Sequence, residues 1–141
     1  MDASRRSIRD RAGAVPRYPD RVDDGADAWL FKVVKEAEWG AVRGPWAGTA
    51  LDRRDGYVHL SGARQVPGTL ARHFPGATDL LLLWIPRSRL AQADLRFEPS
   101  RGGGRFPHLY GTLDPAWVAR IDPLPLDPDG RHRLPPGMPS P

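Results

Sequence analysis

The sequence predicts one small domain of mixed α and β structure. The chain has 141 residues, which is the usual size of a single domain. Hydrophobic residues make up 40% of the chain and five residues are tryptophan, which is enough to build a core. Segments with the alternation of strands and segments with the periodicity of helices follow one another. The 15 glycines and 16 prolines are therefore expected in loops and at the ends.

The two ends of the chain are expected to lie outside this domain. Residues 1–26 are rich in arginine and aspartate and poor in apolar residues, a composition typical of a disordered arm. From residue 124 onward the chain is rich in proline, which excludes a helix or a central strand. We therefore predict a disordered arm over residues 1–26, a single domain over residues 27–134 and an extended proline-rich tail over residues 135–141.

The first half of the domain is expected to contain two strands and a short helix. Residues 29–34 are rich in β-branched and aromatic residues, which favours a strand. Residues 35–42 are good helix formers, and the Gly44-Pro45 pair ends that helix. Residues 49–56 have the composition of a turn, and residues 57–61 alternate as a strand does.

The second half is expected to hold the central strand. Apolar residues recur every four positions from Val66 to Phe74, which predicts a helix over residues 65–74 with Pro67 tolerated near its start. The continuous apolar run over residues 80–85 predicts a strand that is buried on both faces. The remaining expected elements are a turn or short helical piece at 86–91, strands at 95–98, 108–111 and 117–121, and a glycine-rich loop at 101–106.

The charge of the chain has two interpretations. The formal net charge is +4, and 19 of the 21 basic residues are arginine. Arginine codons are favoured in GC-rich genomes, whereas guanidinium groups also bind phosphates and carboxylates. We favour the first interpretation and expect no nucleic-acid partner, because no basic run is interleaved with aromatic residues.

Composition also bears on the compartment. The chain has no cysteine, so it has no disulfide framework, thiolate nucleophile or sulfur-based zinc site, which suits a reducing compartment. The start of the chain lacks the apolar segment of a signal peptide, and the longest apolar run, residues 80–86, is too short to span a bilayer. We therefore expect a cytoplasmic protein with no membrane partner.

The first candidate site lies on the predicted strand at 57–61. Side chains two positions apart point to the same side of a strand, so Tyr57, His59 and Ser61 share one face. A half-buried strand with a solvated outer face has the same pattern. The alternation alone therefore does not separate a binding face from an ordinary surface.

The second candidate site surrounds the glycine-rich loop. Glu98 ends a strand directly before the loop, and His108 and Tyr110 share a face on the strand that follows it. The loop lacks the GK[ST] ending of a nucleotide-hydrolase phosphate loop. The structural alternative is an ion pair between Glu98 and Arg101 in a flexible turn. If the two sites form one pocket, we expect the side chains of His59 and Glu98 within about 12 Å of each other.

The histidines also raise the question of a metal site. Two imidazoles and a carboxylate from His59, His108 and Glu98 suit zinc or iron, but the sequence has no close ligand pair such as HxH or HExxH, so no metal is expected. His73, in a predicted helix, and His132, in the proline-rich end, are expected at the surface.

Seven short motifs follow one another along the domain: Leu30–Lys32, Gly48–Asp52, Asp55–Ser61, Arg72–Phe74, Asp79–Leu83, Phe97–Gly103 and Phe106–Gly111. Taken together they resemble a known family of small bacterial proteins, domain-of-unknown-function family 952. They run in the family's order over roughly residues 29–135, and the last three together are quite specific.

The resemblance implies a fold similar to the ADP-ribosyltransferases: an α+β domain with two short β-sheets and few helices around a cleft for nicotinamide adenine dinucleotide (NAD). It implies that His59 holds a ribose with Ser61 beside it. It also implies that Glu98 supports an oxocarbenium-like transition state and that Tyr57 or Tyr110 stacks on the nicotinamide.

The same resemblance suggests further ligand-binding residues, namely Lys32, Thr49 and Arg101. Three functions remain open for a cleft that takes a small molecule or a nucleotide. The first is an NAD-dependent transferase, with NAD as a possible cofactor. The second is an NAD-independent enzyme of a biosynthetic pathway, with His59, His108 and Glu98 as acid and base catalysts on a small metabolite. The third is a non-catalytic ligand-binding module.

Overall fold

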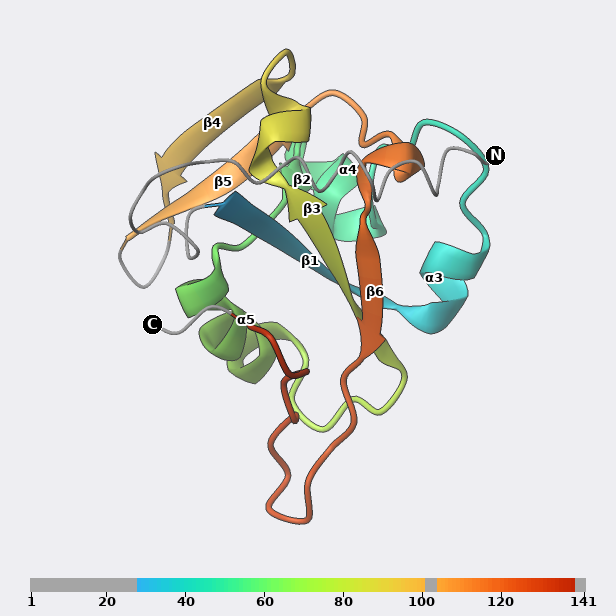
Figure 1. Cartoon of the computed structure of the whole chain (residues 1–141), viewed down its shortest axis with the longest axis vertical. Coiled ribbons are helices and arrows are strands. Elements are labelled where there is room, and N and C mark those ends of the chain that lie inside the picture. The colour runs from blue at the N-terminus through green and yellow to red at the C-terminus, as the bar shows by residue number, and fades with distance from the viewer. Residues whose placement is uncertain (1–27, 101–103, 139–141) are drawn as a thin grey trace.

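A computed structural model describes residues 28–100 and 104–138 of the chain. It consists of two three-stranded antiparallel sheets and a few short helices, so the predicted α+β class is confirmed (Figure 1). The predicted arm over residues 1–26 and the candidate residue Arg101 lie outside the described residues.

The first sheet contains β1 (Trp29–Lys35), β3 (Leu80–Pro86) and β6 (Arg120–Pro123) in the order β1-β3-β6. The prediction of a buried central strand at residues 80–85 is confirmed, because β3 lies between the other two strands and is buried along almost its whole length. The strand is apolar at successive positions because both faces of this sheet are covered, so side chains on either face are buried.

The first sheet separates two hydrophobic clusters. Phe31 and Val33 of β1 belong to the cluster that also holds Val66 and Leu70, whereas Leu30 belongs to the cluster on the side of the second sheet. Alternate residues of one strand therefore enter different cores, as the two-residue period of a strand requires. Lys32 is on the same side as Leu30 and is buried there.

The second sheet contains β2 (Val58–His59), β5 (Arg105–Tyr110) and β4 (Asp94–Pro99) in the order β2-β5-β4. The strand predicted at residues 57–61 is shorter than expected. The Leu60 N–H still donates to the Pro107 carbonyl oxygen of β5 at 3.0 Å, but the N–H and C=O groups of Ser61 exchange hydrogen bonds of 2.8 Å with those of Phe31. This bridge joins the two sheets.

The helices are α3 (Glu36–Gly40), α4 (Ala50–Asp55) and α5 (Val66–His73). The interpretation of residues 49–56 as a turn was wrong, because these residues form α4. Thr49 caps the helix: its side chain accepts from the Asp52 N–H, and the Asp52 carboxylate accepts from the Thr49 N–H. The helix predicted at residues 65–74 is confirmed as α5, with Pro67 in its first turn.

Three short 3-10 helices complete the described elements: Ala63–Gln65, Arg87–Leu90 and Pro115–Trp117. The second confirms the short helical piece expected after β3. The prediction of a strand over residues 117–121 was partly wrong, because Trp117 ends the third 3-10 helix and the strand pairs with β3 only from Arg120 onward. The loop predicted at residues 101–106 is also too long, because β5 already begins at Arg105.

The C-terminal segment packs against the first core. Leu124 is 1% exposed, and Leu134 and Met138 contact the same cluster. An isolated bridge joins Leu126 to His132, and the His132 ring Nε2 lies 2.8 Å from the carbonyl oxygen of Ala77. In Figure 1 this red segment returns to the end of α5.

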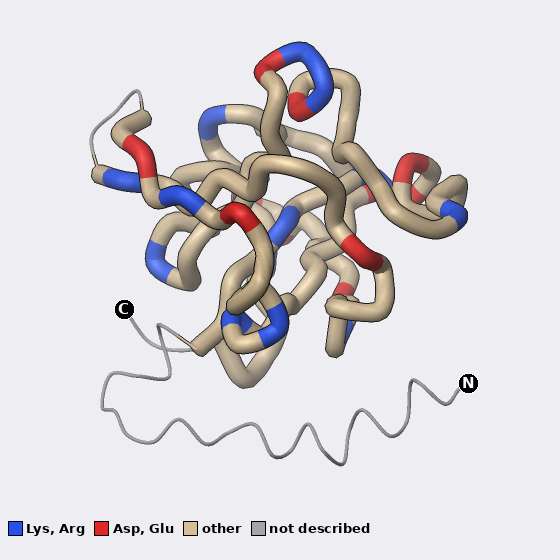
Figure 2. Tube along the Cα trace, turned by 90° about the horizontal axis from the view of Figure 1, so that it is seen from above, with Lys and Arg blue, Asp and Glu red and all other residues tan. Residues whose placement is uncertain are grey.

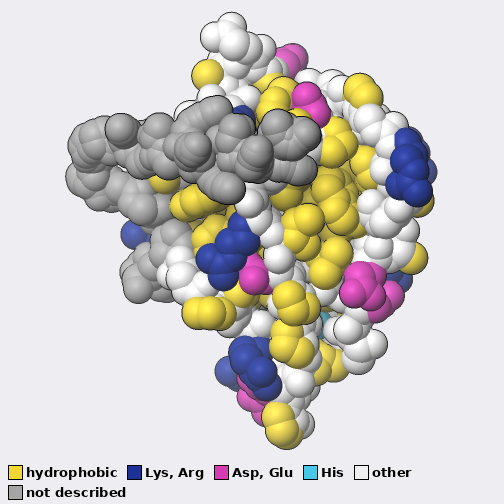
Figure 3. Space-filling view, turned by 45° about the vertical axis from the view of Figure 1, so that its right-hand side comes forward, with side chains coloured by type: hydrophobic (Ala, Val, Ile, Leu, Met, Phe, Trp, Pro, Cys, Tyr) yellow, Lys and Arg dark blue, Asp and Glu magenta, His cyan; other side chains and the backbone are white. Residues whose placement is uncertain are grey.

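Charged and apolar residues are distributed differently over the surface. Acidic and basic residues alternate around the described trace (Figure 2). From the side of α3 and β6, the surface carries a broad area of hydrophobic side chains (Figure 3), and Ile121 of β6 is 44% exposed. Within the described residues, no helix is both long enough and apolar enough to cross a membrane.

Candidate functional site

A buried ion pair forms the base of the candidate site. Lys32 of β1 and Asp52 of α4 are 6% and 1% exposed, and the Lys32 Nζ lies 2.8 Å from the Asp52 Oδ2. The same Nζ donates to the carbonyl oxygen of His59 at 3.0 Å. Burial lowers the pKa of Lys32, and the charge of Asp52 opposes that change.

Asp52 is surrounded by hydrogen-bond donors. In addition to Lys32, the Thr49 N–H donates to Oδ2 at 2.9 Å and the His59 N–H donates to Oδ1 at 3.1 Å. Burial by itself raises the pKa of Asp52. Hydrogen bonding by His59 and the charge of Lys32 outweigh that effect and lower the pKa to about 2. Asp52 is therefore an ionised carboxylate in the interior.

The imidazole of His59 lies between two carboxylates of α4. Its Nδ1 is 2.6 Å from the Asp52 Oδ1, and its Nε2 is 3.1 Å from the Asp55 Oδ2. The ring donates to both carboxylates at once only when both nitrogens carry a proton. Helix α4 therefore orients this ring through both of its nitrogens.

A second histidine–carboxylate pair lies on the neighbouring strands. The Nδ1 of His108 on β5 is 2.7 Å from the Glu98 Oε1 on β4, and the Tyr110 hydroxyl donates to the same oxygen at 2.8 Å. The hydrogen bond from His108 is the largest cause, and that from Tyr110 the second, of a lowered pKa of Glu98. The hydrogen bond to Glu98 in turn raises the pKa of Tyr110.

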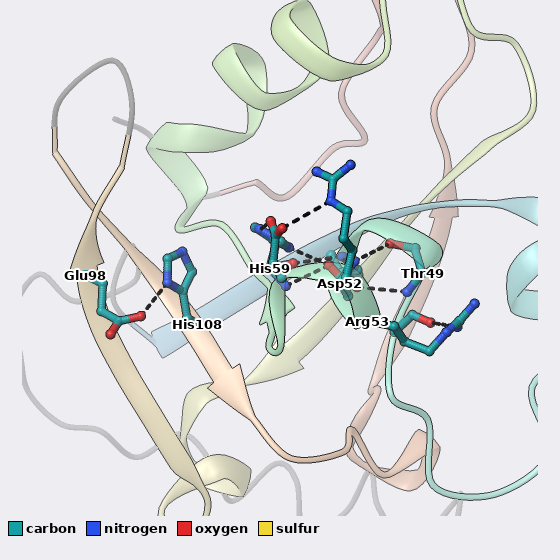
Figure 4. Close-up of polar contacts among 10 residues, drawn as sticks. Thr49, Asp52, Arg53, His59, Glu98 and His108 are labelled. Atoms are coloured by element: carbon teal, nitrogen blue, oxygen red, sulfur yellow. Dashed lines mark hydrogen bonds and ion pairs between the residues drawn. The ribbon is translucent and has the colours of Figure 1, made fainter.

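The two histidines are brought together by strand pairing. His59 and His108 are direct partners in the β2–β5 register, and their ring centroids lie 5.6 Å apart. The Tyr57 ring stacks on His108 at 4.1 Å and contacts the rings of His59 and Tyr110 at 4.7 and 5.2 Å. Figure 4 shows the Glu98–His108 pair on one side and Asp52, Thr49 and His59 on the other.

Both histidines line a pocket of about 290 Å³ between the strands and the segment that leads into α5. Its strand side also includes Lys32 and Ser61, and Thr49 reaches it from the cap of α4. Of the residues singled out from the sequence, five therefore line the pocket: Lys32, Thr49, His59, Ser61 and His108.

Three other predicted residues lie behind the histidines instead of in the pocket. Glu98 and Tyr110 contact His108 through the hydrogen bonds described above, and Tyr57 packs against both imidazoles. None of the three is part of the pocket lining in the described residues. Glu98 thus orients a histidine in this structure, and the expected ion pair partner Arg101 is outside the described range.

The sequence did not point to several residues of the site. Asp52 and Asp55 were included in a predicted turn, although the Thr49-x-x-Asp52 spacing is a capping pattern that signals a helix start. His73 is exposed as expected, but it also lines the pocket together with Arg64 and Arg72. His132, expected at the surface, is half-buried at the carbonyl of Ala77.

Ser61 has a structural role in addition to its place in the pocket. It is 5% exposed, and its hydroxyl lies 2.9 Å from that of Thr69 on α5. This bond ties α5 to the bridge between the sheets. Among the described residues, no group of three or more histidines and carboxylates is arranged to hold a metal ion.

Fold and site together define a small α+β protein with a pocket that contains two carboxylate-bound histidines. Residues 33–121 match the family described as protein of unknown function (DUF952), and the chain belongs to that family. This match confirms the family resemblance seen in the motifs.

Solved structures of protein CC0527 from Caulobacter crescentus are similar to this chain. The protein in its crystal structure is 42% identical in sequence to this chain, and the match covers 75% of this chain and 94% of the CC0527 chain with a TM-score of 0.70. Its solution NMR structure is also 42% identical, covers 74% and 90% of the two chains, and has a TM-score of 0.66. No curated protein matches the chain.

Proposed function

We propose that this protein is an enzyme that uses His59 and His108 for general acid–base catalysis on a small metabolite. The observation that carries the proposal is the pairing of the two histidines across β2 and β5. Both imidazoles line one pocket, and each has its Nδ1 on a carboxylate. Two oriented imidazoles in one pocket are suited to remove a proton from a substrate and to deliver one.

The surroundings of the two rings suggest different roles. His59 has a carboxylate within hydrogen-bond distance of each ring nitrogen, so both nitrogens are oriented, and we assign it as the general acid. His108 has a carboxylate at Nδ1 alone among its described contacts, which orients the Nε2 lone pair for use as the general base. Asp52 and Glu98 act as positioning residues.

Comparative metabolite profiling tests this proposal. The wild-type protein and the variants His59→Gln and His108→Gln are each incubated with a bacterial metabolite extract, and consumed compounds are identified by mass spectrometry. Glutamine keeps a hydrogen-bonding side chain but does not transfer protons at neutral pH. We expect one small metabolite to be consumed by the wild type and its turnover to fall by about 10²–10⁴-fold in each variant.

His132→Gln is the matched control, because His132 lies outside the pocket at the Ala77 carbonyl. It should consume the metabolite as the wild type does. Equal turnover in all four proteins would contradict the assignment of the histidines. If the wild-type protein binds a metabolite without changing it, the protein is a ligand-binding module instead.

A second candidate is an NAD-dependent transferase with the ADP-ribosyltransferase-like fold that the family resemblance implies. The observation in its favour is Glu98, a carboxylate with a lowered pKa beside the rings of Tyr57 and Tyr110. A fixed carboxylate of this kind stabilises positive charge on a sugar ring. The pocket volume of about 290 Å³ is at the lower end for ligand sites, so it fits only part of a dinucleotide.

Thermal unfolding with NAD separates the two candidates. A ligand that binds only the folded state raises the melting temperature, by an amount that grows with the logarithm of the ligand concentration once this exceeds the Kd. The transferase candidate therefore requires a higher melting temperature at millimolar NAD. An unchanged melting temperature would exclude it and leave the acid–base proposal intact.

A further inference from the structure

The wall of the pocket formed by the 3-10 turn Ala63–Gln65 and by α5 carries arginines at helical spacing. Arg64, Gly68 and Arg72 line the pocket and follow one another at intervals of four residues along this segment. Residues four apart in a helical segment lie on the same face. The two arginines therefore lie on one face of the segment, with Gly68 between them.

The charges that line the pocket are predominantly positive. Its described lining includes Lys32, Arg64 and Arg72 but a single carboxylate, Asp52, which already binds Lys32 and His59. Burial, and then the nearby charges of Arg72 and Lys32, lower the pKa of His73, which also lines the pocket.

Gly68 leaves open space between the two arginines. A methyl group added at Gly68 would have no atom within 4 Å, so nothing in the described structure fills this part of the wall. Glycine inside a helix costs about 1 kcal/mol relative to alanine. A larger side chain at position 68, which lines the pocket, would reduce the space in it.

The uncharged polar side chains of this wall are already bonded within the protein. Thr69 contacts the hydroxyl of Ser61, and Gln65 accepts from the Gly62 N–H and donates to the Arg105 carbonyl oxygen. These bonds hold the wall against β5 and against the bridge between the two sheets.

From this arrangement we infer that the pocket binds the phosphate group of a small phosphorylated metabolite between Arg64 and Arg72, with the remainder of the molecule against His59 and His108. Guanidinium groups match phosphate oxygens in charge and in the geometry of two parallel hydrogen bonds. The volume of about 290 Å³ suits a molecule of the size of a sugar phosphate. The inference rests on the proposed function in that it takes this pocket as the substrate site.

Binding of simple probes tests this inference without any assay of turnover. Ribose 5-phosphate and inorganic pyrophosphate are titrated into the full-length protein at concentrations up to about 10 mM, with unphosphorylated ribose as the control, and amide shifts are followed by NMR. We expect both phosphorylated probes to bind and to shift the amides of α5, and ribose to have no effect. Absence of binding by both phosphorylated probes would overturn the inference.

A pair of variants at position 68 isolates the effect of charge. Gly68→Glu and Gly68→Gln add side chains of equal size into open space, so the fold tolerates both, but only glutamate places a negative charge between the arginines. The glutamate variant should bind pyrophosphate at least about tenfold more weakly than the glutamine variant. Equal affinities in the two variants would overturn the inference.

Arg64→Gln provides a second readout on an exposed side chain. It should weaken binding of pyrophosphate and reduce its salt dependence, while the melting temperature stays near that of the wild type. Unchanged affinity would contradict a role for Arg64. The proposed acid–base function is tested separately: loss of turnover in the histidine variants with no binding of phosphate probes would retain the function and reject only the phosphate site.

Discussion

The residues with the largest energetic role in the site are the oppositely charged Lys32 and Asp52. Both are buried, so each requires the other to offset the loss of hydration. Asp52 also receives hydrogen bonds from Thr49 and His59, whereas Lys32 has Asp52 and the His59 carbonyl. This dependence makes the pair sensitive to removal of one partner.

Asp52→Asn is predicted to destabilise the protein by about 3–5 kcal/mol, because it leaves the Lys32 ammonium buried without a counter-charge. Urea denaturation measures the change. The double variant Lys32→Met/Asp52→Asn should recover part of the loss, since it removes the unpaired charge.

The exposed pair Asp94–Arg96 supplies the control for this prediction. Asp94→Asn should leave the denaturation midpoint unchanged, because solvent screens that pair. If Asp52→Asn were as stable as Asp94→Asn, the Lys32–Asp52 pair would not have the role assigned to it.

The pKa of Asp52 predicts a pH dependence of stability. In the folded state it is about 2, below the ordinary value of 3.8, so the ionised form stabilises the fold. This contribution is complete above about pH 4 and is lost as the pH falls towards 2, by about 2 kcal/mol in total. Denaturation at a series of pH values should show this loss in the wild type. A wild-type curve parallel to that of Asp52→Asn between pH 4 and 2 would contradict it.

Among the elements, α4 has the greatest effect on the site although it has only six residues. It supplies Asp52 and Asp55 to the two nitrogens of His59. The helix can begin at this point because Gly48 adopts a φ of +100° and passes close to the Asp52 side chain. A side chain at position 48 would collide with the Asp52 carboxylate. It would also be strained, because residues with a side chain rarely adopt this positive φ.

Gly48→Ala is therefore predicted to lower both stability and His59-dependent turnover, because it displaces Asp52. Gly44→Ala is a matched control: Gly44 also has a positive φ, +92°, but an added methyl group there has no atom within 4 Å. Both variants share the backbone strain of about 1 kcal/mol, so only the collision distinguishes them. Equal melting temperatures and equal turnover for the two would show that Asp52 does not depend on Gly48.

At the scale of the whole molecule, the C-terminal segment completes the first core. Leu134 and Met138 pack on the cluster formed by α5 and the first sheet, and His132 contacts Ala77 in the loop before β3. The same α5 forms the arginine wall of the pocket. The segment thus supports the site from the other side of the helix.

A chain that ends at Asp127 is predicted to lose about 2–3 kcal/mol of stability, because two apolar side chains no longer cover the core. Thermal unfolding followed by circular dichroism measures the loss. A melting temperature equal to that of the full chain would mean that the segment contributes no packing energy.

The local patterns of the sequence were sufficient for most elements and insufficient for others. The buried run at residues 80–85 and the apolar period at residues 65–74 predicted β3 and α5, because each signal is a property of neighbouring residues. Helix α4 was missed because its composition is polar and its first turn depends on a cap. The strand predicted at residues 57–61 is longer than the observed β2, because Ser61 pairs with Phe31 and not with β5.

By itself the sequence determined the α+β class, the family and the faces on which His59, His108 and Tyr110 lie, since side-chain alternation is a local consequence of backbone geometry. The tertiary structure alone decided that His59 and His108 are direct partners and that Glu98 lies behind His108. It also decided which carboxylates bind the imidazoles and which arginines line the same pocket. These contacts join segments far apart in the chain, and they form because buried charges and unpaired strand edges each require a partner that only the folded chain supplies.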